Sequence, residues 1–258
     1  MKSTIAQPKK QFMATKFETY IPIFGYHHIE KPLKKSKNKG LYVAPEYFEW
    51  QIKKLIKHGF EIITFEDIVS NSFRKNNPLA ILTFDDGCES VYLNAFQVLK
   101  KYHIKAVVYL ITDSIGKEYV VPQEDPGINP ARMLTEAQIR EMADYGIEFG
   151  SHLCQHIFIT QYPPDRIKHE LNSSKEMLEK LLNKKVLSIS YPFGDYNEIV
   201  LKLAKEAGYA FGVTTNTGTL SMEKNLELCR MPTKGYALRH YWYFRKNLRI
   251  AINQISSK

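Results

Sequence analysis

Short apolar runs alternate with amphipathic stretches along most of the chain. The apolar runs have strand character, and the stretches between them place apolar side chains on one face at helical spacing. The predicted strands span 20–26, 60–64, 79–84, 105–112, 147–150, 185–190 and 209–214, and the predicted helices span 45–57, a short stretch from 66, 90–102, 135–145, 164–182 and 198–207. Alternation of this kind predicts parallel pairing through right-handed crossovers. We therefore expect a single-domain α/β fold, a distorted (β/α) barrel of about seven parallel strands.

Two stretches interrupt this alternation and are predicted to be loops. Residues 31–40 (KPLKKSKNKG) are strongly basic, and residues 116–130 are rich in Pro and Gly. A long loop of the second kind often borders a functional site. No linker divides the chain, so we expect an N-terminal extension over 1–19, one domain over 20–237 and a basic, aromatic segment over 238–258.

Composition bounds the class of protein. With 258 residues, 44% of them hydrophobic, the chain can bury a full core. Its three cysteines have no paired spacing, which argues against a disulfide framework and favours a reducing compartment. The N-terminus has no apolar run of signal-peptide length, and no window reaches the length of a membrane span. We expect a cytoplasmic protein, unless an export signal has been removed.

The net charge of +9 has two interpretations. The plain one is a lysine-rich, solvated surface. The other concerns segment 238–258, where Arg and Lys are interleaved with Tyr, Trp, Phe, Leu and Ile, a pattern typical of helices that lie on anionic membranes. Peripheral contact with the inner membrane face is therefore a hypothesis. A nucleic-acid partner is not expected because no recognition motif accompanies the charge, and no oligomeric state is predicted.

Functional-type side chains follow four of the predicted strands at the same end. They are His27 and His28 after 20–26, Asp85 and Asp86 after 79–84, His152 after 147–150, and Tyr191-Pro192-Phe193-Gly194 after 185–190. The carboxyl ends of parallel strands meet at one face of a barrel or open sheet. These side chains are therefore expected to converge.

The combination of an aspartate pair and a histidine pair predicts a hydrolytic metal site. A catalytic zinc takes three protein ligands and keeps one position open for water, which it makes acidic near neutral pH. One carboxylate of Asp85-Asp86 can ligate the metal beside His152 and His156, while its neighbour accepts the proton. Either pair alone is more often a turn or a polar helix face, so the prediction depends on their combination. Cys154 is excluded because its side chain at i+2 would point away from the histidines.

The chain resembles the polysaccharide deacetylase family of metal-dependent carbohydrate esterases. The resemblance runs from Pro22 to Tyr236, and its motifs are Leu82-Thr83-Phe84-Asp85-Asp86-Gly87, Gly150-Ser151-His152 through His156, and Tyr191-Pro192-Phe193-Gly194. It implies that Asp86, His152 and His156 hold zinc, or another divalent transition metal such as cobalt or nickel. It also implies that Asp85 is the general base and that the backbone N–H of Phe193 helps to hold the oxyanion.

The chain departs from the family's pattern at the residue that orients the base. Many members carry an arginine two residues before the proline of the third motif, and this chain has Ser190 there. Arg230, which follows the run from Leu226 to Cys229, is the candidate replacement.

A second departure concerns the general acid. Many members place a catalytic histidine late in the chain, where His240 is only a weak match. Instead, Gly25-Tyr26-His27-His28 resembles the branch that deacetylates poly-N-acetylglucosamine. This implies His27 as the general acid and leaves His28 a packing role.

The resemblance implies removal of N-acetyl groups from a sugar in a polysaccharide or a lipid-linked glycan, with release of acetate. Two alternatives stay open. One is an amidohydrolase of the same fold that acts on a non-sugar amide, and the other is a non-catalytic glycan-binding relative, against which the retained Asp85 argues. An aspartate-nucleophile phosphatase is disfavoured because it would show Asp-x-Asp and an oxygen-rich magnesium site.

Overall fold

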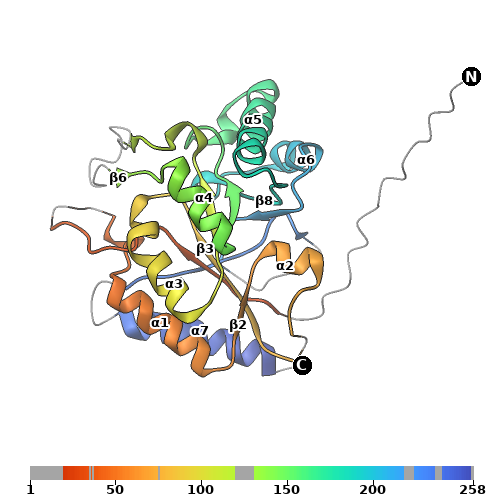
Figure 1. Cartoon of the computed structure of the whole chain (residues 1–258). Coiled ribbons are helices and arrows are strands. Elements are labelled where there is room, and N and C mark those ends of the chain that lie inside the picture. Colours follow the sequence, from red (N-terminus) through yellow and green to blue (C-terminus); the bar gives the residue numbers. More distant parts are fainter. Residues whose placement is uncertain are drawn as a thin grey trace, which may run out of the picture.

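Parallel strands occupy the centre of the molecule, and helices surround them (Figure 1). The computed structural model describes residues 20–34, 36, 38–74, 76–119, 131–217, 224–235 and 240–256. Within these residues the sheet curls on itself as a partial barrel, which confirms the predicted fold class.

In the described part of the chain, the main sheet has eight strands, and all of its pairings are parallel. Its order is β10-β1-β3-β4-β7-β8-β9, and β2 pairs with the first half of β3 beside this path. The bounds are β1 (Ile23–Tyr26), β2 (Glu61–Ile63), β3 (Leu79–Phe84), β4 (Val107–Leu110), β7 (Glu148–Ser151), β8 (Ser188–Ser190), β9 (Phe211–Val213) and β10 (Met231–Pro232). Every strand predicted from the sequence is present, and β10 is an addition.

The two ends of the curled sheet are linked through the segment that leads into β10. Leu228 bridges Val213 of β9 in parallel, and its N–H donates to the carbonyl of Gly212. Directly afterwards, β10 pairs with β1. The segment therefore spans the gap between β9 and β1, and Arg230 lies within it.

The predicted helices are all present, with small changes at their ends. Their bounds are α1 (Pro45–Lys57), α2 (Phe65–Ser70), α3 (Phe96–Tyr102), α4 (Glu136–Tyr145), α5 (Pro164–Leu182) and α6 (Glu198–Glu206). A further helix, α7 (His240–Ser256), lies in the C-terminal segment and was not among the predicted helices. The helix predicted over 90–102 begins with a π-helical turn at Val91–Ala95 before α3. Thr135 caps α4 through a reciprocal capping box with Gln138, as its position in the sequence indicates.

Strand β3 illustrates how the core positions the functional residues. All of its side chains (LAILTF) are buried, as expected for a parallel strand that is covered on both faces. Asp85 follows the strand at once and is itself buried. The aspartate pair therefore directly follows a strand that is buried on both faces.

The segment predicted as a long loop over 116–130 is structured at both ends. β5 (Glu118–Tyr119) and β6 (Ala131–Arg132) pair as a two-stranded antiparallel sheet, which the Pro and Gly content did not indicate. Residues 120–130 lie outside the described part of the chain. In the basic stretch, a 3-10 turn at Lys39–Leu41 begins within the last two residues of the loop predicted over 31–40.

The C-terminal segment forms α7, which packs beside α1 (Figure 1). Phe244 is buried with its ring centroid 5.5 Å from that of Phe24, and Tyr241 lies 4.3 Å from Trp50 of α1. Trp242 is exposed. Among the described residues, no helix is both long and apolar enough to cross a membrane. The membrane-surface contact stays a prediction, and the N-terminal extension over 1–19 lies outside the described residues.

Candidate active site

The carboxyl ends of β1, β3 and β7 bring the predicted residues together. Strands β1 and β3 pair in register, so His27 emerges beside Asp85, with 3.6 Å between His27 Nε2 and Asp85 Oδ2. His152 Nε2 lies 3.3 Å from Asp86 Oδ1, and His156 Nε2 lies 3.6 Å from the same oxygen. The convergence expected from the strand ends is therefore present.

Asp86, His152 and His156 form a set that fits a divalent metal ion. One ligand atom from each lies within 4.8 Å of the others. Ligand atoms about 2.0–2.1 Å from a tetrahedral zinc lie roughly 3.3 Å apart, close to the two observed separations. Asp86 Oδ1 is buried, and neither imidazole contact gives it a hydrogen bond. A buried carboxylate oxygen that faces two imidazole nitrogens in this way is suited to a cation.

Contacts outside this set orient His152. Its Nδ1 lies 2.6 Å from the carbonyl oxygen of Ser190, which can only accept a hydrogen bond. Nδ1 is therefore protonated, and Nε2 presents its lone pair toward Asp86. For Asp86, burial alone would raise the pKa, but the contacts with His152, His27 and His156 lower it, so the carboxylate is ionised at neutral pH.

The imidazoles of His156 and His152 differ in pKa, and therefore in how strongly a proton competes with a metal ion for each ring. Burial lowers the pKa of His156 to about 4, so this ring is neutral across the working range. Burial would also lower the pKa of His152, but Asp86, Asp85 and the carbonyl of Ser190 together outweigh it and raise the pKa above the ordinary value of 6.5. A proton on His152 therefore competes with the metal.

Metal affinity is accordingly expected to fall as the pH is lowered. Only the neutral imidazole binds, so affinity should drop about tenfold per pH unit once the pH is below the pKa of His152 in the metal-free protein. Calorimetric titration at pH 6 in buffers of different ionisation enthalpy should show about one proton released per ion bound. Affinity that is unchanged between pH 8 and pH 6 would contradict the role given to His152.

Arg230 is the partner of Asp85. Nη1 and Nη2 donate to Asp85 Oδ1 and Oδ2 at 2.8 and 2.7 Å, a two-point contact between buried groups. Nη2 also lies 3.3 Å from Ser190 Oγ, and Nε donates to the carbonyl of Thr214 at 2.9 Å. The arginine missing at Ser190 in the sequence is thus supplied to the same place by a residue that directly precedes β10.

This contact sets the charge of the candidate base. Burial alone would raise the pKa of Asp85, but the guanidinium of Arg230 lowers it to about 2. Asp85 is therefore ionised throughout the working range, and the two-point contact fixes the orientation of its carboxylate.

Phe193 follows β8 in a strained conformation. Its φ of 59° and ψ of 1° are unusual for a residue other than glycine. The ring is 49% exposed, stacks on Phe158 at 4.0 Å between centroids and lies 4.3 Å from the ring of His156. An aromatic surface therefore borders the metal-ligand set.

The other histidines singled out in the sequence have different places. His28 is buried, stacks on Tyr42 at 4.5 Å and has its Nδ1 3.3 Å from Glu30 Oε1, in keeping with a packing role. It also places a ligand atom near Asp86 and Cys88. His240 begins α7 on the flank of the barrel.

Comparison with known proteins agrees with these features. A family model described as polysaccharide deacetylase matches residues 73–212. The Bacillus subtilis protein YxkH is 32% identical over 209 residues, which cover 80% of this chain and 68% of that protein. The poly-beta-1,6-N-acetyl-D-glucosamine N-deacetylase of Staphylococcus aureus is 26% identical over 198 residues, which cover 72% of this chain and 66% of that protein. The chain thus spans about two thirds of the length of these curated relatives.

A solved structure shares both sequence and fold with the chain. The structure of the Streptococcus pyogenes deacetylase PplD in complex with acetate matches with a TM-score of 0.72 and 32% identity, covering 83% of this chain and 92% of that chain. The matched family region contains all three motifs, whereas the N-terminal histidines His27 and His28 lie before it. The chain belongs to the polysaccharide deacetylase family, a family of metal-dependent carbohydrate esterases that act on N-acetylated glycans.

Proposed function

We propose that this chain is a zinc-dependent N-deacetylase that removes acetyl groups from N-acetylglucosamine residues of a polysaccharide or lipid-linked glycan. One observation carries the proposal. An ionised carboxylate, Asp85, is fixed by Arg230 and lies between a histidine and a metal-ligand set, with His27 Nε2 3.6 Å away. A binding module has no need of this additional, oriented base.

Each group has a distinct part in amide hydrolysis. A divalent ion held by Asp86, His152 and His156 would supply an acidic water and a polarised acetamide carbonyl. Asp85 takes the proton of the attacking water as general base. The backbone N–H of Phe193 donates to the oxyanion. His27 gives a proton to the departing sugar nitrogen, which is otherwise a poor leaving group.

The aromatic surface beside the site supports a glycan rather than a small amide. Phe158 and Phe193 are 42% and 49% exposed and stack with an interplanar angle of 9°. Exposed apolar groups next to a polar site are typical of ligand-binding surfaces, and a pyranose ring offers a C–H face to an aromatic ring. The similarity to the Staphylococcus aureus enzyme makes β-1,6-linked N-acetylglucosamine the first substrate to test.

The proposal predicts that acetate release depends on bound metal. After removal of metal with a chelator and reloading with zinc, cobalt or nickel, acetate release from β-1,6-linked N-acetylglucosamine oligomers should rise in proportion to the ion bound, up to one per chain. The same preparations are assayed on β-1,4-linked oligomers and on N-acetylated amino acids. Acetate assay and elemental analysis of each preparation give the two quantities.

The outcomes separate the alternatives. Hydrolysis of N-acetylated amino acids without hydrolysis of any oligomer would favour the amidohydrolase of the same fold. Metal and oligomer binding without acetate release from any substrate would favour the non-catalytic relative.

A further inference from the structure

The chain between the two histidine ligands is a loop with a strained residue. After β7, Leu153 has a φ of 65°, in the left-handed region that β- and γ-branched side chains rarely adopt. Its N–H donates to Ser151 Oγ at 3.0 Å, and this hydroxyl lies 2.7 Å from Ser174 Oγ of α5. His152 and His156 therefore do not share a helical face, and their separation depends on what holds the loop.

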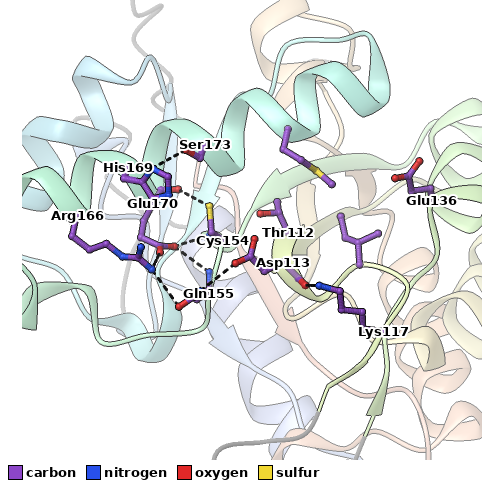
Figure 2. A pocket seen from close by; sticks show the side chains of 12 residues that line it. Thr112, Asp113, Lys117, Glu136, Cys154, Gln155, Arg166, His169, Glu170 and Ser173 are labelled. Carbon is purple, nitrogen blue, oxygen red and sulfur yellow. Dashed lines mark hydrogen bonds and ion pairs between the residues drawn. The ribbon is translucent and has the colours of Figure 1, made fainter.

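A cavity lies along part of this loop. The pocket in Figure 2 has a volume of about 490 Å³ and is bounded by the loop, α5 and the residues after β4, with Cys154, Gln155 and Thr112 among its lining. On that side the loop lacks close apolar packing. Polar contacts supply support there instead. The N–H groups of Thr112 and Asp113 donate to the carbonyls of Leu153 and Cys154 at 3.1 and 3.0 Å, and the loop's own N–H groups turn toward α5.

Glu170 of α5 makes those contacts. Its Oε2 accepts hydrogen bonds from the backbone N–H groups of Cys154 at 2.9 Å and Gln155 at 3.1 Å, both of which lie between the ligands. Figure 2 shows the side chain pointing from α5 to this backbone. Hydrogen bonds to a carboxylate are stronger than those to a neutral acceptor.

The buried position of Glu170 is unfavourable for a carboxylate unless other groups compensate its charge. The residue is 0% exposed and sits beside Ile167 and Leu171 on the buried face of α5. Burial of a carboxylate is unfavourable without a partner. Arg166, one turn earlier, supplies the charge, with Nη2 2.7 Å from Glu170 Oε1, and also reaches Gln155 Oε1 at 3.3 Å.

We propose that Glu170 is a positioning residue that fixes the backbone between His152 and His156 and thereby sets the metal affinity of the site. Arg166 holds Glu170 in place. The inference rests on the proposed function because it requires His152 and His156 to be metal ligands. It adds a residue that lies outside the three motifs.

The same helix offers a matched control. Glu179 accepts a hydrogen bond from the backbone N–H of Val186 at 3.0 Å and pairs with Lys175 at 2.7 Å, also one turn earlier. It thus makes the same kinds of contact as Glu170 but supports the chain before β8 instead of the ligand loop. Replacing either glutamate should therefore lower the stability of the protein, whereas only replacing Glu170 should lower its metal affinity.

The test compares Glu170→Gln with Glu179→Gln in the full chain. The zinc dissociation constant is measured by competition with a chromophoric chelator, and thermal unfolding of the metal-free proteins is measured in parallel. We expect the constant to rise about 10–100-fold in Glu170→Gln, as is usual for groups that orient metal ligands, and less than threefold in Glu179→Gln. Hydrogen exchange of the Cys154 and Gln155 amides in the metal-free protein should be faster in Glu170→Gln only.

Arg166→Met provides a milder variant if Glu170→Gln does not fold, because the Arg166 side chain is 36% exposed. It should weaken zinc binding in the same direction. Zinc constants for Glu170→Gln and Arg166→Met within threefold of the parent would overturn the inference while leaving the proposed function intact. A parent chain that binds no divalent ion would instead overturn the proposed function, and the inference with it.

Discussion

Replacement of Asp85 by Asn is expected to lower turnover by about 10²–10⁴-fold, the usual contribution of a general base. Asn has nearly the same shape but cannot take the proton of the attacking water. The metal ligands are Asp86, His152 and His156, so the Asp85→Asn protein should keep most of its zinc. The measurement is acetate release per bound ion, with zinc content determined on the same sample.

The variant also carries a structural cost that must be separated from the catalytic one. Asp85 and Arg230 are both buried, and Asn can accept only one of the two hydrogen bonds from the guanidinium. Removing one partner of a buried ion pair typically costs about 3–5 kcal/mol. The Asp85→Asn, Arg230→Met double variant removes both charges, so it should regain stability without regaining turnover.

Asp86→Asn is the comparison that tests the division of roles within the pair. It alters a ligand rather than the base, so zinc content should fall together with activity. Equal loss of zinc in Asp85→Asn and Asp86→Asn would show that the roles of the two aspartates have been assigned wrongly.

The helices and strands were predictable because local signals and packing agree in them. Helix α1 starts at Pro45 and α5 at Pro164, where a residue without an N–H is suited to the first turn, and both helices have the predicted bounds. β3 was visible as an apolar run because both of its faces are covered. β10 was missed since a strand of two residues, Met231–Pro232, carries no periodicity.

The site was predictable where a strand end placed its residues. Asp85, Asp86, His27 and His152 directly follow strands, and parallel pairing then brings them together. Arg230 does not follow a strand. It reaches a partner 145 residues away across the curled sheet, and only the resemblance suggested it.

The role of Glu170 could be predicted from the sequence only in part, for a different reason. Its spacing from Ile167 and Leu171 placed it next to the buried face of a helix, and a carboxylate there was a signal that the apolar pattern alone did not explain. Its partners are backbone N–H groups, which have no sequence signature. Their identity required the structure.

Replacement of His27 by Ala is expected to lower the rate on N-acetylglucosamine oligomers by about 10²–10⁴-fold and to cost much less on an activated acetyl ester. The sugar amine must be protonated as it departs, whereas an activated phenolate leaves without help. His27 Nε2, 3.6 Å from Asp85 Oδ2, is the candidate donor. The ratio of the two rates in the same protein cancels any shared loss of folded or metal-loaded enzyme.

The pH profile gives this assignment a second test. Burial lowers the pKa of His27 below its ordinary value of 6.5, against the opposing effect of Asp85, whereas the pKa of Asp85 is about 2. At saturating metal, the base is therefore always ionised, and loss of the proton from His27 should lower kcat/KM on acetamides as the pH rises through the pKa of His27. His27→Ala should remove this alkaline limb, and His28→Ala, which alters a packed side chain, should retain it. If His27→Ala matches the parent on the oligomers and keeps the limb while His240→Ala is inactive, the acid comes from α7, and the similarity to the poly-N-acetylglucosamine branch does not extend to the acid.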